Sequence, residues 1–128
     1  MSAKRIVIID DDADQLAGLQ IRLTASGYDV SSARDAMQAI AVVRSMKPDL
    51  ILLDIGLPGG DGHMVLARLK SLGPLAAIPV IILSAMDPAS NVERMKKAGA
   101  VAYFQKPADN AKLLAEIRKA LGETVPQA

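Results

Sequence analysis

The sequence has no cysteine and no tryptophan, few other aromatic residues and a single histidine. The absence of cysteine excludes disulfides, thiolate metal sites and cysteine nucleophiles, and it is compatible with a reducing compartment. No segment reaches the ~18 consecutive apolar residues that a membrane-spanning helix needs. The apolar run at 6–9 is interrupted by Asp10, Asp11 and Asp12, too early for a signal peptide. We therefore expect a soluble, cytoplasmic protein that makes no membrane contact.

Charge and length narrow the class of protein further. With 15 basic and 14 acidic residues the formal net charge is +1, so no overall field draws the chain to nucleic acid, and direct nucleic-acid binding is not expected. A length of 128 residues, 51% of them hydrophobic, is enough for one domain with its own core. We expect that domain at 1–122. A polar segment at 123–128 is either a natural terminus or the start of a linker.

Short apolar runs alternate with helix-period segments along the whole chain. Runs rich in β-branched residues at 6–9, 50–53 and 80–83 are typical of parallel strands covered on both faces, and weaker strands are expected at 28–32 and 101–105. The helical segments have apolar faces formed by Leu16, Leu19 and Leu23; by Ala36, Ala39, Ile40 and Val43; by Val65, Leu66 and Leu69; by Val92, Met95 and Ala98; and by Leu113, Leu114, Ile117 and Leu121.

Five strands that alternate with five helices predict an α/β protein, with a doubly wound, five-stranded parallel sheet and helices on both faces. The flavodoxin-like strand order 2-1-3-4-5 fits this pattern. In the first helix, Asp12 is expected to cap the amino end with Gln15 three residues further on, and Gly27 is expected to end the helix.

Polar residues stand where the apolar strands stop. The first strand is followed by Asp10 and Asp11, the third by Asp54 and the fourth by Ser84, while the fifth leads to Lys106. Ligands of such sheets bind at the carboxyl ends of the strands, and the first and third strands are neighbours in the order 2-1-3-4-5, so the three aspartates should converge. Converging carboxylates repel unless a cation neutralises them. With no histidine or cysteine close by, the site suits Mg²⁺ or Mn²⁺.

The same residues suit phosphoryl transfer, which asks a protein mainly for positioning and charge neutralisation. Asp54 would be the nucleophile. The Ser84 hydroxyl and the Lys106 ammonium group would each contact a phosphoryl oxygen.

Four fragments stand in order along nearly the whole chain: Ile6-Val-Ile-Ile-Asp-Asp11, the stretch from Asp49 to Gly62, Pro79-Val-Ile-Ile-Leu-Ser-Ala85 and Tyr103-Phe-Gln-Lys-Pro107. Together they resemble the receiver domains of two-component response regulators. One fragment alone is a weak signal, but four at suitable spacings are a strong one. The resemblance implies a bacterial signalling domain of a phosphorelay rather than an enzyme that turns over a small molecule.

The resemblance also implies a role for individual residues of the acidic site. Asp54 would be the phosphoacceptor. Asp11 would bind Mg²⁺ directly, Asp10 would bind it directly or through water, and the backbone carbonyl of Gly56 would be the third ligand from the protein.

A switch is implied as well. The Ser84 hydroxyl would turn toward the phosphoryl group, and the ring of Tyr103 would move into the space that it leaves, as a shift between two states. The Lys106–Pro107 peptide is expected to be cis and to direct the lysine into the site.

The implied phosphodonor is a phosphohistidine of a sensor histidine kinase or of a histidine phosphotransfer domain. The output partner or effector domain stays unknown, and a phosphorylation-dependent dimer is compatible with the resemblance. Whether the chain stands alone or is part of a larger regulator or hybrid kinase is left open.

Two alternatives compete with this interpretation. Asp10-x-Asp12 is also similar to the nucleophile motif of haloacid-dehalogenase-like phosphohydrolases, which would make Asp10 the nucleophile, although Asp14 stands where threonine or valine is usual. The other alternative is a degenerate receiver that acts as a scaffold without phosphorylation. For single residues, Tyr103 could be an ordinary core aromatic, and His63 is expected to face solvent rather than bind metal.

Overall fold

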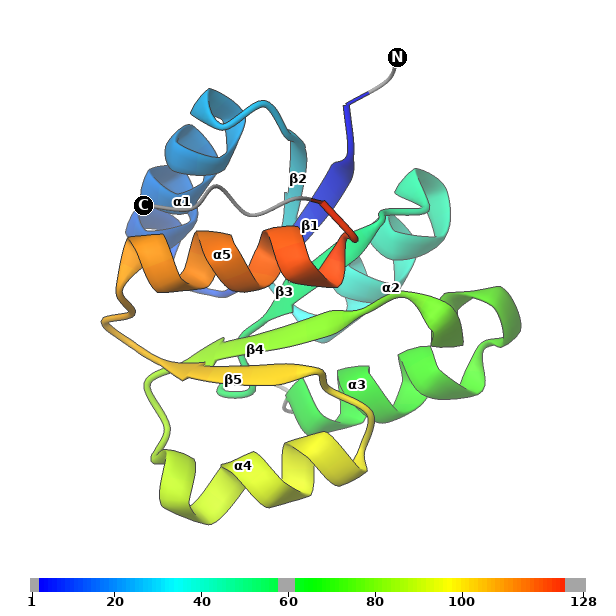
Figure 1. Ribbon diagram of the computed structural model, residues 1–128. Helices are drawn as coiled ribbons and strands as arrows, with labels where there is room; N and C mark the ends of the chain where they lie inside the picture. Colours follow the sequence, from blue (N-terminus) through cyan, green and yellow to red (C-terminus); the bar gives the residue numbers. More distant parts are fainter. Residues whose placement is uncertain (1–2, 58–61, 124–128) are drawn as a thin grey trace.

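A computed structural model describes residues 3–57 and 62–123, and Figure 1 shows a central sheet with helices on both of its faces. The five strands are parallel and lie in the order β2-β1-β3-β4-β5, which confirms the predicted doubly wound fold and strand order. The elements along the chain are β1 (Arg5–Ile9), α1 (Ala13–Ala25), β2 (Asp29–Ala33), α2 (Ala36–Met46), β3 (Leu50–Leu53), α3 (Gly62–Ser71), the 3₁₀ helix η1 (Gly73–Ala77), β4 (Val80–Ser84), α4 (Pro88–Lys97), β5 (Ala102–Gln105) and α5 (Asn110–Ala120).

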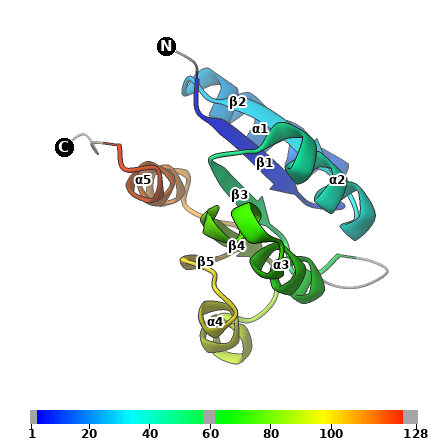
Figure 2. The same ribbon diagram turned by 90° about the vertical axis from the view of Figure 1, so that its right-hand side faces the viewer.

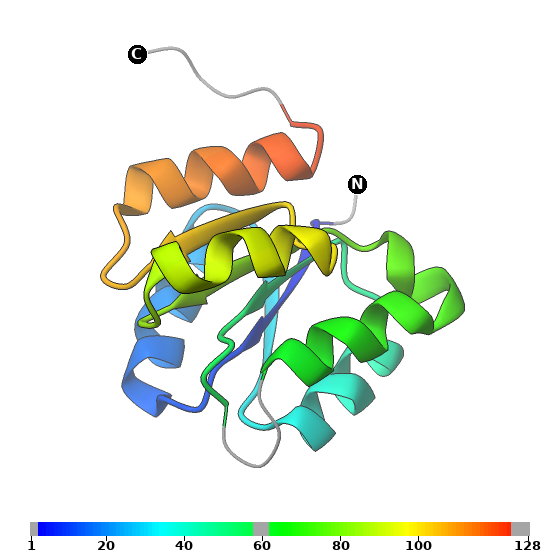
Figure 3. The same ribbon diagram turned by 90° about the horizontal axis from the view of Figure 1, so that it is seen from below.

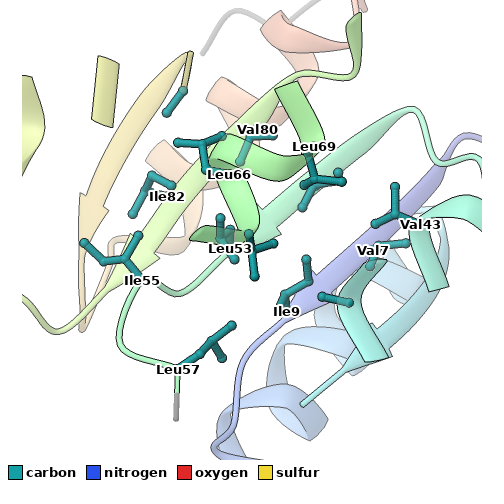
Figure 4. Close-up of a cluster of buried hydrophobic side chains, with 14 of the residues drawn as sticks. Val7, Ile9, Val43, Leu53, Ile55, Leu57, Leu66, Leu69, Val80 and Ile82 are labelled. Carbon is teal, nitrogen blue, oxygen red and sulfur yellow. The ribbon is translucent and has the colours of Figure 1, made fainter. Parts of the chain in front are cut away.

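The sheet separates two hydrophobic cores. Successive side chains of a strand point to opposite faces, so in β1 the residues Val7 and Ile9 face α2, α3 and α4, whereas Ile6 and Ile8 face α1 and α5. Figure 2 shows α5 and the pair α3 and α4 on opposite sides of the strands. Figure 4 shows the first of these cores, where Leu53 and Ile82 pack beneath Leu66 of α3. Because β1, β3 and β4 are covered on both sides, nearly all their residues are apolar.

The ends of α1 follow the predicted capping residues. The Asp12 carboxylate accepts hydrogen bonds from the backbone N–H groups of Asp14 and Gln15, at 3.0 and 3.2 Å. At the other end Gly27 has a φ of 96°, in the left-handed region that glycine adopts without strain. Asp12 therefore serves the helix and lies outside the acidic group described below.

Both weaker strands begin one residue later than predicted. β2 begins at Asp29, because Tyr28 turns into the core on the α1 and α5 side, where its hydroxyl donates to Glu123 at 2.7 Å. β5 begins at Ala102, and Val101 before it is exposed.

Two features of the helical layer differ from the prediction or were missed. The predicted apolar face of α4 included Val92, but the buried residues of α4 are Asn91 and Met95. The Asn91 amide donates to the backbone carbonyl of Asp87 at 2.8 Å, so this polar side chain is buried with its hydrogen bond made. The 3₁₀ helix η1 between α3 and β4 was not predicted.

No helix in the described ranges is long and apolar enough to cross a membrane. The polar segment predicted at 123–128 falls outside the described residues except for Glu123, and so does the 58–61 part of the fragment from Asp49 to Gly62.

Candidate functional site

Two aspartates are held side by side at the carboxyl edge of the sheet. The backbone N–H of Asp10 donates to the carbonyl of Ala33 at 3.0 Å, and that of Asp54 donates to the carbonyl of Ile9 at 2.9 Å. These bonds extend the β1–β2 and β1–β3 ladders by one residue past the strands. Asp10 is 3% exposed and Asp54 is 9% exposed. Both carboxylates are therefore largely removed from water, and hydrogen bonds from the backbone compensate for that loss only in part.

Asp11 completes an acidic cluster. One carboxylate oxygen from each of Asp10, Asp11 and Asp54 lies within 4.8 Å of the others, which confirms the predicted convergence. Asp11 is exposed, so the cluster opens to solvent on its side. All of these donors are hard oxygen atoms, the ligands that Mg²⁺ and Mn²⁺ prefer.

Lys106 lies against the two buried carboxylates. Its Nζ atom is 2.5 Å from Oδ2 of Asp10 and 3.1 Å from Oδ2 of Asp54. The Lys106–Pro107 peptide is cis, as predicted, and the Lys106 backbone N–H donates to the carbonyl of Ser84 at 2.8 Å. Burial alone would lower the pKa of Lys106, but its hydrogen bonds to Asp10 and Asp54, and their charges, outweigh burial and raise it. The side chain is therefore an ammonium ion at neutral pH.

The charge balance fits a divalent cation. Three carboxylates and one ammonium group leave an excess of two negative charges at this edge of the sheet. Gly56 adjoins the cluster, and its backbone N–H donates to Oδ1 of Asp54 at 2.8 Å, which fixes the orientation of that carboxylate. The assignment of the Gly56 carbonyl as a metal ligand stays a prediction.

Ser84 and Tyr103 meet at the same residue, Met86. Ser84 is 1% exposed at the end of β4, and its Oγ accepts from the Met86 backbone N–H at 3.2 Å. The Tyr103 hydroxyl donates to the Met86 carbonyl at 2.7 Å. Burial raises the pKa of Tyr103, and the nearby Ser84 hydroxyl offsets part of that rise. Sequence reasoning paired Ser84 with Tyr103 but missed that the backbone of Met86 connects them, because a backbone bond leaves no mark on residue type.

Gly62 was also missed as a residue that supports the site. Its backbone N–H donates to the carbonyl of Ile55 at 3.1 Å. A Cβ at position 62 would lie 2.4 Å from Cα of Ile55 and 2.5 Å from the carbonyl oxygen of Asp54. The start of α3 therefore rests directly on the backbone of the predicted phosphoacceptor, and a side chain at 62 would displace it. The sequence offers only a glycine before a helix as a signal.

His63 takes no part in the acidic cluster. It is half-buried rather than fully open to solvent, and its ring nitrogens lie 2.6 and 2.9 Å from Nη2 of Arg94. This contact joins the start of α3 to α4.

A parallel sheet in the order 2-1-3-4-5, with paired aspartates, a third at the next strand and a lysine facing them, is the arrangement of a response regulator receiver domain. A sequence model described as "Response regulator receiver domain" matches residues 6–118, and the chain belongs to this family. This membership argues against the phosphohydrolase alternative. The family is one of signalling domains from two-component systems.

Curated relatives contain the same domain within longer proteins. Response regulator PleD of Caulobacter vibrioides is 37% identical over 118 residues, which are 92% of this chain and 26% of PleD. The DNA-binding dual master transcriptional regulator RpaA of Synechocystis is 39% identical over 126 residues, 97% of this chain and 52% of RpaA. The chain thus spans between about a quarter and a half of these relatives.

Solved structures agree with the fold. The CheY-like receiver domain protein of Methanospirillum hungatei JF-1 has a TM-score of 0.87 and 32% identity, with 94% of this chain and 95% of that one covered. The BeF3-activated N-terminal receiver domain of Klebsiella pneumoniae RstA has a TM-score of 0.85 and 31% identity, with coverage of 92% and 98%.

Proposed function

We propose that this receiver domain accepts a phosphoryl group on Asp54 in a Mg²⁺-dependent reaction, from a phosphohistidine of a sensor histidine kinase or a histidine phosphotransfer domain. The observation that carries the proposal is the environment of the Asp54 carboxylate. One oxygen is fixed by the Gly56 N–H, the other faces Lys106, and two further carboxylates lie within reach. This is a preorganised site for a group that brings negative charge.

In the proposed transfer, a carboxylate oxygen of Asp54 attacks the phosphorus atom. The P–N bond to the donor imidazole breaks, its electron pair stays on the nitrogen, and an acyl phosphate forms on Asp54. The Lys106 ammonium group, already 3.1 Å from Asp54, balances charge on the transferred group. Asp10 keeps Lys106 at this edge, and the Asp12 backbone N–H holds the other Asp10 oxygen at 2.9 Å.

The acidic cluster fits the divalent cation that this chemistry needs. When bound, Mg²⁺ or Mn²⁺ would be held by the carboxylates of Asp10, Asp11 and Asp54 with the carbonyl of Gly56, and it would neutralise charge on the phosphoryl oxygens. Without a cation, the excess negative charge of the cluster opposes the approach of a phosphodonor.

The switch would start at Ser84. A phosphoryl group on Asp54 offers oxygen atoms to the Ser84 hydroxyl, which now accepts from the Met86 N–H. When that hydroxyl turns, Met86 loses one of its two anchors, and the bond from Tyr103 to the Met86 carbonyl is the other. The loop between β4 and α4 would thus move together with the ring of Tyr103, as a shift between two populated states.

The wider assignments rest on the same proposal. We assign residues 1–122 to the receiver domain and 123–128 to a tail or the start of a linker. We place the domain in the cytoplasm, where a kinase partner would meet it. An output partner or an effector domain would read the state of the switch, and a phosphorylation-dependent dimer is compatible with it.

The test is intact mass spectrometry after incubation with acetyl phosphate and Mg²⁺. The wild type should gain one phosphoryl group in an acid-stable, base-labile adduct, and chelation of the metal should prevent it. Asp54→Asn should gain none, whereas the matched control Asp29→Asn, an exposed aspartate in β2, should be modified like the wild type. An undiminished adduct on Asp54→Asn would refute the assignment, and no adduct on the wild type would support the scaffold alternative.

A further inference from the structure

The surface between α2 and α3 holds an open groove that the phosphoryl chemistry does not use. The two helices lie side by side on one face of the sheet, as Figure 3 shows. The groove between them has a volume of about 880 Å³. Its lining is mainly apolar and includes Met37, Ile40 and Arg44 of α2 and Met64, Val65 and Arg68 of α3.

Two methionines stand at one end of the groove. Met37 is 87% exposed and Met64 is 65% exposed, and both line the same groove, so together they offer apolar surface to a partner. Both lie in the first turn of their helices. Because all strands of the sheet are parallel, α2 and α3 run in the same direction, and the methionine end lies toward the carboxyl edge of the sheet. Flexible methionine side chains adapt to the shape of an apolar partner.

Two arginines stand at the other end. Arg44 follows Met37 by roughly 10 Å and Arg68 follows Met64 by about 6 Å along their helices, at 1.5 Å per residue. Both are exposed, and among residues 3–57 and 62–123 neither side chain forms an ion pair. Neither α2 nor α3 contains an acidic residue. The groove therefore pairs an apolar end with a cationic end that carboxylates would complement.

We propose that this α2–α3 groove docks an amphipathic helix of another protein, with apolar side chains that contact Met37 and Met64 and acidic side chains one to two turns further along that contact Arg44 and Arg68. A concave surface favours an inserted helix over a flat bilayer, which would reach only its rims. A second copy of this chain is a poor occupant, because each of the described helices carries at most one acidic residue, namely Asp14, Glu93 and Glu116 in α1, α4 and α5.

The proposal can be tested with two synthetic peptides in a lactam-stabilised helix of about four turns. One peptide carries leucine anchors and glutamates at the spacing given above, and its twin carries lysine in place of each glutamate. Binding to the full chain is measured by fluorescence anisotropy. The glutamate peptide should bind saturably, with an affinity that falls as salt is added, and the lysine twin should bind about tenfold or more weakly.

Variants of the protein locate the site. Arg44→Glu with Arg68→Glu, and separately Met37→Ser with Met64→Ser, should each weaken binding of the glutamate peptide about tenfold or more. The matched controls Lys119→Glu on α5 and Ile21→Ser on α1 change exposed residues elsewhere and should keep wild-type affinity. None of the six substituted positions belongs to the acidic cluster or contacts Asp54 through Lys106 or Gly56, so acetyl phosphate labelling of each variant should match the wild type.

Several results would overturn the proposal. The proposal would be wrong if binding of the glutamate peptide did not saturate, or if the lysine twin bound as tightly as the glutamate peptide. It would also be wrong if the groove variants bound the glutamate peptide with unchanged affinity. Vesicles of phosphatidylglycerol that bind the wild type but not the groove variants, with no peptide binding, would make the groove a membrane surface instead. Self-association that the groove variants abolish, seen by sedimentation, would make it an interface between two copies. Because the binding and self-association measurements do not use phosphorylation, their outcome is independent of the proposed function.

Discussion

Asp10 and Asp54 share the ammonium group of Lys106, which lies 2.5 Å from the first carboxylate and 3.1 Å from the second. The lysine therefore bridges the ends of β1 and β3, although 96 and 52 residues of sequence separate it from the two aspartates. This one cation attracts both buried carboxylates and offsets their mutual repulsion, so they can lie close together. The site is thus assembled, and its main charges are partly balanced, before the proposed phosphoryl group arrives.

Replacing Lys106 with methionine should destabilise the protein in the absence of metal. The variant leaves two buried carboxylates without their ammonium partner, at a cost of about 3 kcal/mol in the free energy of unfolding. Added Mg²⁺ should restore more stability to Lys106→Met than it adds to the wild type. Urea denaturation with and without Mg²⁺ measures both effects, and the exposed control Lys112→Met should change stability by less than about 0.5 kcal/mol. Equal stability of Lys106→Met and the wild type would contradict this account.

Gly62→Ala should destabilise the fold and slow the reaction at Asp54. The new Cβ would meet backbone atoms of Ile55 and Asp54 at 2.4 and 2.5 Å, which cannot rotate away, so we expect a loss of about 2 kcal/mol or more. Labelling by acetyl phosphate should be slower as well, because the Asp54 backbone must shift.

Gly18→Ala is the matched control for Gly62→Ala. Gly18 lies within α1, and outside the helix backbone the nearest atom to an added Cβ is a flexible guanidinium nitrogen of Arg22 at 3.8 Å. This substitution should stabilise the protein by about 0.5 to 1 kcal/mol. If both alanine variants changed the free energy of unfolding alike in chemical denaturation, the close packing of Gly62 on Asp54 would not explain the effect of Gly62→Ala.

Tyr103→Phe should loosen the loop between β4 and α4. The variant removes the hydrogen bond from the tyrosine hydroxyl to the Met86 carbonyl, which is worth about 1 kcal/mol, so amide exchange at 85–87 should accelerate about fivefold. Hydrogen–deuterium exchange with mass spectrometry measures this. Tyr28→Phe should leave that segment unchanged. If amide exchange at Met86 were equally fast in Tyr103→Phe and in the wild type, the proposed link between Ser84 and Tyr103 would be contradicted.

The stability of the protein should fall in alkali because of Tyr28. Burial, followed by the hydrogen bond to Glu123 and the charge of that residue, raises the pKa of Tyr28 from 10.0 to about 12. A group with a higher pKa in the folded state binds its proton more tightly there. Its contribution is therefore complete below pH 10 and is lost as the pH rises toward 12.

Urea denaturation between these pH values should show the effect of Tyr28 as a difference between proteins. The wild type should lose up to about 2 kcal/mol more than Tyr28→Phe across this range. Tyr103→Phe, which keeps Tyr28, should retain most of the wild-type slope. The same slope in the wild type and in Tyr28→Phe would show that other groups control the alkaline limit.

Much of the architecture was predictable because the residues that form it carry strong local signals. The runs at 6–9, 50–53 and 80–83 are apolar throughout, and both faces of those strands are covered. Asp12 and Gly27 mark the ends of α1 by their own chemistry. The convergence of Asp10, Asp11 and Asp54 then followed from the strand order alone.

Other features could not be predicted from the sequence because they depend on tertiary contacts. Asn91 replaces Val92 on the buried face of α4 since its amide finds the Asp87 carbonyl, and no periodicity of apolar residues reports that. The links of Met86 and the packing of Gly62 involve backbone atoms, so any residue type except proline at position 86 would leave the same bonds in place. The α2–α3 groove requires two helices to be placed side by side before its lining can be recognised.

The hydrogen bond between Tyr103 and Met86 has a practical consequence for spectroscopy. The chain contains no tryptophan and only two tyrosines, so its near-ultraviolet signal comes almost entirely from Tyr28 and Tyr103. Tyr28 is paired with Glu123, which lies just beyond the carboxyl end of α5, whereas Tyr103 is hydrogen-bonded to the loop beside Ser84. In Tyr28→Phe, Tyr103 is the single remaining tyrosine, and it sits where the proposed switch moves. Ultraviolet difference absorbance and tyrosine emission of that variant can then follow the loop in real time, without an attached dye.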